Sequence, residues 1–331
     1  MASPLTLTRV WRIVKEVDLD GIRREAGRRA HILVVGETTA DADALAIRLV
    51  QGQIDPTPYV TAIDAPLAAL GLRHIHPGGH QAPGDAPTLL LAVTRGAEIS
   101  ADMKAARKQW AARQVPLVTV AIGTAEEDGT IHADGGVARV SIDRLDDGGF
   151  RHVVDGLFRV VAPESRTSLA RRFPVLRPKV FNAIVEDTAR ANAGYAFSTG
   201  LAEIVPILDI PLNIGDIVVL TKNQLMMSYR LALAAGKTGQ PRELVGEIVG
   251  VLGGGLLFRQ AARQLVGLLP AIGLVPKVAV AYGGTWAIGR AVVLWATGGG
   301  TVTRARLKEL TREGLARGRE VAKSLRRSVR T

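Results

Sequence analysis

Three histidines come closest to a metal-ligand set in this sequence. His74, His76 and His80 lie close together in the chain, and imidazole is a common ligand of zinc and copper. The nearest acid is Asp85, and the chain has no cysteine, so thiolate sites and disulfides are excluded. Because this ligand set is incomplete, we interpret the segment as a polar loop and predict no metal and no other cofactor.

Two clusters of carboxylates are the next candidates for chemistry. They consist of Glu126, Glu127 and Asp128, and of Asp143, Asp146 and Asp147. General acid–base catalysis needs a carboxyl group whose pKa is tuned by an apolar pocket or a close partner. Neither cluster has such a pocket in its sequence, so we interpret both as solvated turns and predict no catalytic residue.

Polar residues also interrupt an apolar stretch, residues 191–236, at regular places. Its prolines break any continuous helix, and a helical pattern resumes at residue 217. Asp216 is predicted to cap that helix. Gln224 falls on its apolar face, where a buried amide needs a partner, and Asp209, Asn213 or a backbone carbonyl could serve. We predict seven structural positions: Asn192, Pro206, Asp209, Pro211, Asp216, Gln224 and Gly236.

The residues before this stretch alternate between apolar β-branched runs and helical patterns. The runs predict strands at 31–35, 87–93, 115–122 and 137–142, and the patterns predict helices at 44–50, 98–114 and 150–161. Helix 98–114 should bury Met103, Ala106 and Trp110. Strands that alternate with helices indicate a parallel sheet covered on both faces.

The strand–glycine–helix order at residues 31–50 is typical of a nucleotide-binding domain, but the residues that bind nucleotide are missing. A P-loop reads G-x-x-x-x-G-K-[ST], and counting from Gly36 the last three positions are Asp41, Ala42 and Asp43. No lysine or arginine stands nearby in the sequence. The guanine-reading Asn-Lys-x-Asp becomes residues 123–126, where only Glu126 is similar, and no Asp-x-x-Gly precedes Pro87. The domain resembles an Era-like GTPase domain without its chemistry, which implies a P-loop-like fold that does not hydrolyse GTP.

The order of residues within 191–236 carries a second resemblance. The matching residues are Asn192, Ala193, Ile210, Pro211, Asp216, Leu220, Thr221, Gln224, Met226 or Met227, and Gly236. In this order they resemble the YcjF-like family, over about residues 175–300. That resemblance implies a helical, membrane-associated domain of unknown function that often follows an Era-like GTPase domain.

The chain of 331 residues is long enough for two domains with a sizeable core. We predict five parts: a basic amphipathic helix at 1–30, a degenerate GTPase-like α/β domain at 31–162, a link at 163–178, a YcjF-like all-α apolar domain at 179–303, and a basic helical tail at 304–331. In the helical domain, Gly246, Gly250 and Gly254 are four apart, a spacing that lets helix backbones approach closely.

Charge and hydropathy favour a membrane location. The net charge is +11, and both ends of the chain are basic. The charge-free runs 264–276, 278–289 and 291–303 are shorter than the roughly 18 residues of a clean transmembrane helix. A hairpin crossing the bilayer and a bundle resting on the anionic inner leaflet therefore both stay open. We expect the cytoplasmic face, and no signal peptide.

The sequence therefore predicts a non-catalytic, membrane-associated protein that combines a pseudo-GTPase module with a YcjF-like helical domain. Its partners would be anionic lipid and another protein, for example an active GTPase. A GTPase with an atypical phosphate site is one alternative. Nucleic-acid binding through the basic tail is the other, although the tail has no aromatic residue to stack on bases.

Overall fold

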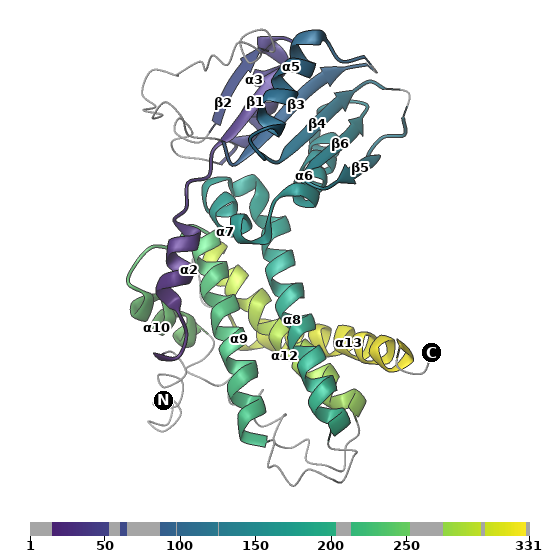
Figure 1. Cartoon of the computed structure of the whole chain (residues 1–331). Coiled ribbons are helices and arrows are strands. Elements are labelled where there is room, and N and C mark those ends of the chain that lie inside the picture. The colour runs from purple at the N-terminus through teal and green to yellow at the C-terminus, as the bar shows by residue number, and fades with distance from the viewer. Residues whose placement is uncertain are drawn as a thin grey trace. The chain divides into compact units, whose positions relative to one another are not determined.

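In this computed structural model a β-sheet flanked by helices organises residues 27–179, and helices make up most of the other described residues (Figure 1). The structure describes residues 15–52, 60–64, 87–96, 98–124, 126–202, 213–251, 274–298 and 302–328. The chain divides into two units. The α/β unit contains residues 27–179, and the helical unit combines residues 1–26 with 180–331.

Among the described residues the sheet has six strands in the order β2-β1-β3-β4-β6-β5. Their bounds are β1 Ile32–Gly36, β2 Val60–Asp64, β3 Leu89–Arg95, β4 Leu117–Ile122, β5 Ile131–Asp134 and β6 Val137–Ile142. These strands pair in parallel except for the edge strand β5, which runs antiparallel to β6. The predicted α/β fold with a mainly parallel sheet, followed by a helical region, is confirmed.

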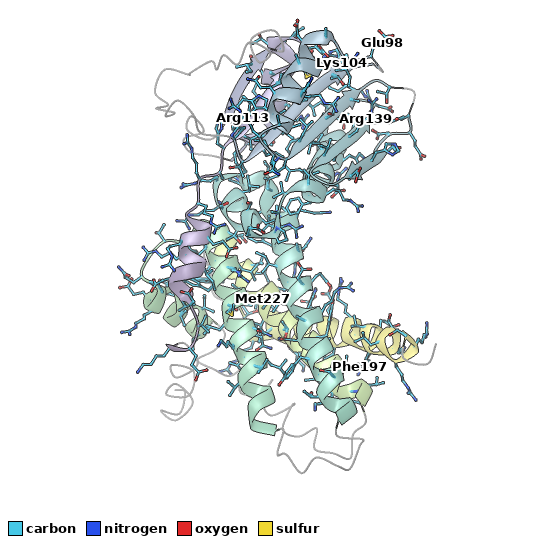
Figure 2. The ribbon with its side chains drawn as sticks, viewed as in Figure 1. Glu98, Lys104, Arg113, Arg139, Phe197 and Met227 are labelled. Carbon is cyan, nitrogen blue, oxygen red and sulfur yellow. The ribbon has the colours of Figure 1, made fainter. Side chains whose placement is uncertain are left out.

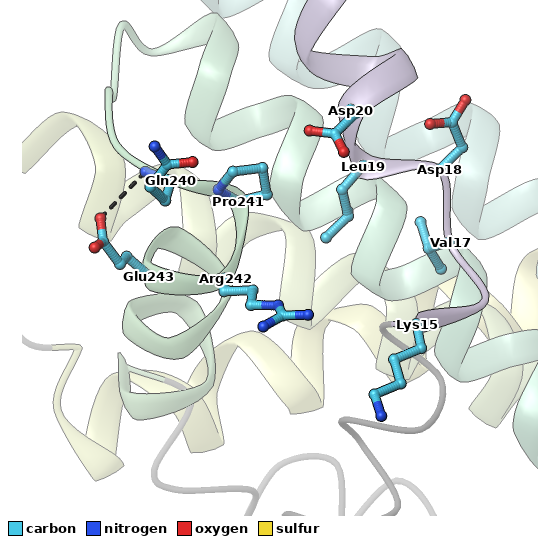
Figure 3. Close-up of a pocket in the computed structure, with 9 residues that line it drawn as sticks. All are labelled: Lys15, Val17, Asp18, Leu19, Asp20, Gln240, Pro241, Arg242 and Glu243. Carbon is cyan, nitrogen blue, oxygen red and sulfur yellow. Dashed lines mark hydrogen bonds between the residues drawn. The ribbon is translucent and has the colours of Figure 1, made fainter.

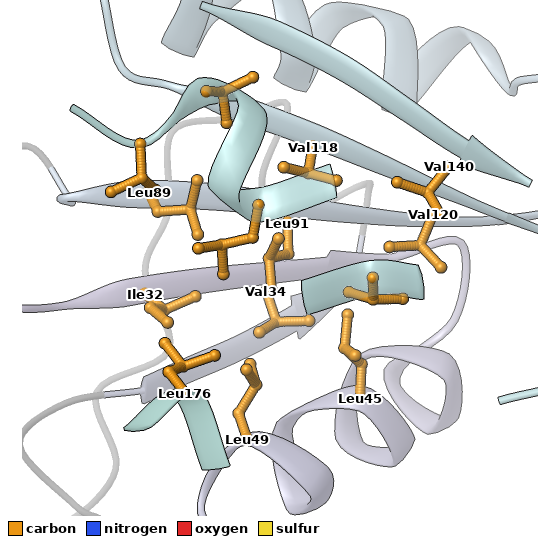
Figure 4. Packing of buried hydrophobic residues seen from close by; sticks show 14 of the residues in the cluster. Ile32, Val34, Leu45, Leu49, Leu89, Leu91, Val118, Val120, Val140 and Leu176 are labelled. Atoms are coloured by element: carbon orange, nitrogen blue, oxygen red, sulfur yellow. The ribbon is translucent and has the colours of Figure 1, made fainter. Parts of the chain in front are cut away.

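Helices cover both faces of this sheet. They are α3 Thr39–Leu49, α5 Ala101–Ala111, α6 Asp147–Val160, α7 Pro163–Arg172 and the 3-10 helix η1 Pro174–Leu176. Leu89 and Leu91 of β3 pack in a cluster with residues of α3 and α6 (Figure 4). Leu90 packs on the other face, against the predicted buried side of α5: Met103, Ala106 and Trp110. Burial on both faces explains why these strands are continuously apolar.

Two of the strands were not predicted from the sequence. β2 is the run Val-Thr-Ala-Ile-Asp, and β5 is the polar run Ile-His-Ala-Asp at the sheet edge. Parallel strands such as β4 and β6 need a crossover connection, which is usually a helix. Here β5 lies within the connection and pairs with β6 from the far side. The sheet therefore ends in a hairpin with a polar edge, which discourages pairing with other chains.

The helical unit is built around α12. Its helices are α2 Leu19–Ala26, α8 Arg177–Ala202, α9 Asn213–Ala234, α10 Pro241–Val251, α12 Leu274–Gly298 and α13 Arg304–Ser328, of which α8 begins in the α/β unit (Figure 1). Hydrogen bonds join α8 to α12 at Asn182–Arg290 and at Asn192–Thr285, so these two helices run antiparallel. Gln224 of α9 also bonds Thr285.

Glycines bring α12 and α13 into backbone contact. A Cβ on Gly283 would lie 2.7 Å from the backbone of Gly314, and one on Gly318 would clash with the backbone of Ala279. The buried residues of α13 are Leu310, Gly314, Gly318 and Ala322, each four positions apart. The predicted basic tail is therefore a helix packed along its length. By contrast, Cβ atoms on Gly246 and Gly250 would meet no described atom within 4 Å, so these two predicted glycines mark no close approach, and Gly254 lies outside the described residues.

The segment that the sequence suggests as a link, 163–178, contains α7, η1 and the start of α8. Its Phe173 and Leu176 are fully buried in the core of the α/β unit. A short segment with three prolines reads as a link, yet Pro163, Pro174 and Pro178 all occupy first-turn positions, where proline is tolerated.

One helix among the described residues is long and apolar enough to cross a membrane. It spans Val275–Gly298 of α12, with a mean hydropathy of 1.3. Most of its apolar stretch, 72%, is buried inside the protein, which is also typical of the core helix of a soluble protein. Length and composition alone therefore do not establish a crossing, and several crossings have no support among the described helices.

Candidate functional site at the switch point of the sheet

The carboxyl end of β1 is the place in this fold where a ligand would be expected. From β1 the chain goes to β2 on one side, and then to β3 on the other side. In open α/β sheets, ligands bind in the crevice that this reversal creates, outside the carboxyl ends of the strands. Gly36 ends β1, and α3 begins at Thr39, so the amino end of α3 faces this switch point. Exposed amides and the helix dipole make such an end a natural anion site.

An aspartate of the protein itself occupies this end of α3. Asp41 is only 4% exposed. Its Oδ1 accepts from Nε of Arg95 at 2.8 Å and lies 2.7 Å from the Nη2 of that residue. Its Oδ2 accepts from Oγ1 of Thr38 at 3.0 Å. A carboxylate paired with a guanidinium and held at a helix amino end therefore stands where a bound anion would stand.

The first-turn amides are also engaged. Thr38 is the N-cap of α3, and its Oγ1 accepts from the backbone N–H of Asp41 at 3.3 Å. The N–H of Ala42 donates to the carbonyl of Thr38 at 3.2 Å. A Cβ on Gly36 would lie 2.5 Å from the nitrogen of Ala42, so only glycine fits in this turn. Two amides of the first turn, those of Asp41 and Ala42, therefore already donate to Thr38.

A second carboxylate fixes the outer side of this loop. Glu37 accepts from Oγ of Ser100 at 2.5 Å and from its backbone N–H at 3.3 Å. Ser100 is also the N-cap of α5, where its Oγ accepts from the N–H of Met103 at 3.1 Å. The β1–α3 loop is therefore tied to the start of α5, which adds a second negative charge near the crevice.

The sequence shows no cation close to Gly36, but the fold brings Arg95 there. The arginine ends β3, and it reaches Asp41 across 54 positions of the chain. The sequence analysis also missed Asp64, which ends β2 and is in register with Gly36. The β-branched residues Val60, Thr61 and Ile63 before it were a usable signal. Asp64 is followed in sequence by Ala-Pro-Leu, so the glycine of an Asp-x-x-Gly switch is absent.

The residues that follow β4, where a GTPase domain would bind its guanine base, also pair with other side chains of the protein. Glu126 follows β4 and accepts a short hydrogen bond from Oγ of Ser141, which is fully buried on β6. Arg139, labelled on the sheet in Figure 2, lies 3.9 Å from the same carboxylate, and His132 lies at 4.0 Å. The hydrogen bond from Ser141, followed by the nearby charge of Arg139, lowers the pKa of Glu126.

Two of the other acids in the predicted clusters accept backbone hydrogen bonds. Asp128 accepts from the N–H of Asp143 at 3.0 Å. Asp146 is the N-cap of α6 and accepts from the N–H groups of Gly148 and Gly149, both at 2.9 Å. These hydrogen bonds lower the pKa of Asp146. The acids therefore organise turns.

In the helical unit, two of the seven predicted structural residues meet in a buried polar network. The Oγ1 of Thr285 accepts from Nδ2 of Asn192 at 2.8 Å and from Nε2 of Gln224 at 3.0 Å, and it donates to the carbonyl of Ala281 at 2.8 Å. Asn223 donates to Oδ1 of Asn192 at 2.8 Å. Gln224 is therefore paired with Thr285, whereas Asp209 and the side chain of Asn213, two of its predicted partners, lie outside the described part of the chain. We call Asn192, Asn223, Gln224 and Thr285 the polar network.

The remaining predicted positions have different outcomes. Gly236 adopts a φ of +93° just after α9, a conformation that glycine adopts easily. Asp216 lies inside α9, which begins at Asn213, so its predicted N-cap role is wrong. Pro206, Asp209 and Pro211 lie outside the described residues. So do His74, His76, His80 and Asp85, and the described residues contain no group of three or more potential metal ligands.

A second concave site lies within the helical unit, between the chain before α2 and the start of α10 (Figure 3). Its lining mixes Lys15 and Arg242 with Asp18, Asp20 and Glu243. Glu243 accepts from the N–H of Gln240 at 3.2 Å, and Asp18 accepts from the N–H of Gly21 at 2.7 Å. Two of the three acids of this pocket, Asp18 and Glu243, are therefore engaged at helix amino ends.

Comparison with known proteins adds no further constraint on this site. No protein-family model matches the chain, and no curated protein and no solved structure shows significant similarity to it.

Proposed function

We propose that this chain is a non-catalytic, membrane-associated protein. Its α/β unit would be a pseudo-GTPase module, and its helical unit a YcjF-like domain that acts through lipid and protein contacts. The observation that carries the first part is the Asp41 carboxylate at the amino end of α3, held by Arg95 and Thr38. The other partner would be a protein that supplies chemistry, for example an active GTPase.

Electrostatics supports the absence of nucleotide binding. Two like unit charges 4 Å apart repel by about 4 kcal/mol at an effective dielectric constant of 20. A phosphate at the amino end of α3 would lie close to the Asp41 carboxylate, with Glu37 nearby, and would meet repulsion of this kind. The cation that could offset this repulsion, Arg95, is already paired with Asp41.

Calorimetry with GTP and Mg²⁺ tests this part. We expect no binding by the wild type, and micromolar affinity would overturn the proposal and favour the alternative of a GTPase with an atypical site. Replacing Asp41 with serine frees Arg95 and removes the repulsion, so Asp41→Ser should gain weak affinity for inorganic phosphate. Asp43→Ser is the matched control, because it removes an exposed carboxylate two positions away. Equal phosphate binding by the two variants would contradict the role of Asp41.

The sequence and the directions of the helices support the proposed membrane attachment. α8 ends at residue 202, and α9 begins at residue 213. Because α12 runs antiparallel to α8, α12 begins near the carboxyl end of α8. The sequences that join helices there are mainly apolar: residues 203–212, with only Glu203 and Asp209 charged, and residues 252–273, with only Arg259 and Arg263 charged. Since α12 is largely buried, we propose attachment to the cytoplasmic leaflet through this end of the unit.

Flotation with liposomes, followed by a carbonate wash, tests the attachment. We expect the protein to float with vesicles that contain anionic lipid. A protein that is monodisperse without detergent and does not float with such vesicles would refute the membrane part, and the calorimetric result for the α/β unit would stand on its own.

A further inference from the structure

The exposed bases of α13 are sorted onto one side of the helix. α13 carries nine bases and three acids. Projected at about 100° per residue, five exposed bases fall within roughly 60° of one another. They are Lys308, Arg312, Arg319, Lys323 and Arg326, which we call the basic stripe. The stripe points away from the buried face that packs on α12.

The acids of α13 lie together in a neighbouring sector and are neutralised there. Glu309 lies 2.6 Å from Arg306, Glu313 lies 3.1 Å from Arg317, and Glu320 lies 2.8 Å from Lys323. Only Lys323 of the basic stripe takes part in these pairs. The other four bases of the stripe have no acidic partner among the described residues.

The stripe is long, straight and fixed in position. Eighteen residues of helix separate Lys308 from Arg326, which is about 27 Å at 1.5 Å per residue. The glycine contacts of Gly283 with Gly314 and of Ala279 with Gly318 hold α13 against α12. A line of charges held by a packed helix loses less backbone entropy on binding than a disordered basic tail would.

We propose that the basic stripe is the surface that lies on anionic lipid headgroups. This inference rests on the proposed membrane attachment and names its electrostatic part. A straight row of bases on a convex helix fits a flat anionic surface, which a bilayer provides. The contact of Ala279 with Gly318 also brings the later half of α13 beside the start of α12, where the apolar sequence 252–273 enters.

Nucleic acid is the other polyanion that such a stripe could meet, and the composition of α13 does not favour it. The helix contains no aromatic residue to stack on bases, and no asparagine or glutamine to read them. We therefore commit to lipid and treat nucleic acid as an outcome of the test.

The test compares two triple variants of the full-length chain. The stripe variant is Lys308→Gln, Arg312→Gln and Arg319→Gln. The control variant, Lys104→Gln, Lys108→Gln and Arg151→Gln, removes the same charge from exposed positions of the α/β unit. Co-sedimentation with phosphatidylserine–phosphatidylcholine vesicles at 0.1 M salt should be at least about tenfold weaker for the stripe variant, whereas the control should stay within about twofold of wild type. The stripe variant should also lose most of the salt dependence.

Each other result overturns the inference in a distinct way. Equal vesicle binding by the stripe variant and wild type would refute the stripe but leave apolar attachment standing. No binding by wild type would refute both. Loss of binding to duplex DNA with unchanged vesicle binding would assign the stripe to nucleic acid. If the stripe variant does not fold, Ala305→Lys adds an exposed base near the same line, and it should strengthen anionic vesicle binding by a few fold. Unchanged binding by that variant would again refute the stripe.

Discussion

Removing the hydroxyl group of Thr285 should destabilise the helical unit more than its small size suggests. Valine has nearly the shape of threonine, so Thr285→Val leaves no cavity. It does leave Nδ2 of Asn192 and Nε2 of Gln224 without an acceptor, in side chains that are 0% and 4% exposed. A buried polar group left unpaired costs about 1–3 kcal/mol, so we expect a loss of about 2–6 kcal/mol.

Two variants control for the loss of a methyl group and for the change from threonine to valine itself. Thr285→Ser keeps the hydroxyl and loses one methyl, which costs about 1 kcal/mol. Thr297→Val makes the same chemical change on the same helix at an exposed position, where a substitution stays within about 0.5 kcal/mol. Urea unfolding followed by tryptophan fluorescence suits the measurement, because Trp286 and Trp295 both lie on α12.

The order of the effects tests the network itself. Gln224→Leu should cost less than Thr285→Val, because Oγ1 of Thr285 keeps the hydrogen bond from Asn192. The double variant should cost less than the sum of the two, since leucine removes one of the donors that valine leaves unpaired. If Thr285→Val is no less stable than Thr285→Ser, the polar network does not stabilise this unit and the reasoning fails.

Two further predictions concern backbone contact and pH. Gly314→Ala should destabilise the protein because its new Cβ would clash with the backbone of Gly283, whereas Gly246→Ala should stabilise it slightly, by up to about 1 kcal/mol, because alanine is the better helix former and meets no described atom. Thermal unfolding separates them, and equal shifts of Tm would contradict the close contact. Asp146→Ala should lower Tm at pH 7, because Asp146 caps α6. Since the folded-state pKa of Asp146 is depressed, its stabilisation is present above the unfolded pKa of about 3.9 and disappears as pH falls through the folded value, so the difference from wild type should shrink below pH 4. A difference that stays constant from pH 7 to pH 2 would show that the charge of Asp146 plays no part.

The central strands could be predicted because burial on both faces leaves a continuous apolar run in the sequence. β1, β3 and β4 carry this signal, and β6 carries a weaker one that Arg139 and Ser141 interrupt. The edge strand β5 lacks it, because its residues are exposed or half-exposed and backbone pairing with β6 alone defines it. Hydrophobic patterns identify strands by what they bury, so an edge strand that buries little gives no pattern.

The polar network and the ion pair of Asp41 with Arg95 could be predicted from the sequence only in part. Burial of Gln224 follows from its place on an apolar helical face, but its partner Thr285 lies 61 positions away on another helix. Arg95 likewise ends a strand 54 positions after Asp41, and nothing local marks it as a partner. A sequence pattern shows that a buried group needs a partner, and only the packing of the elements decides which residue supplies it.

The polar network also bears on how the helical unit would meet a membrane. A helix that crosses lipid alone must present apolar residues all round, but α12 places Thr285 among amide donors from α8 and α9, and Tyr282 donates to Glu186 of α8 at 2.7 Å. Gly283 faces Gly314 of α13, and Gly289 faces Val185 of α8 and Met227 of α9, which is labelled in Figure 2. The apolar residues of α12 are thus explained by protein neighbours on several sides. A membrane contact, if the flotation experiment finds one, then has to come from the basic stripe and from the apolar sequences at the end of the unit. For that reason, substitutions on α13 are a sharper probe of attachment than deletion of α12, which would remove the core.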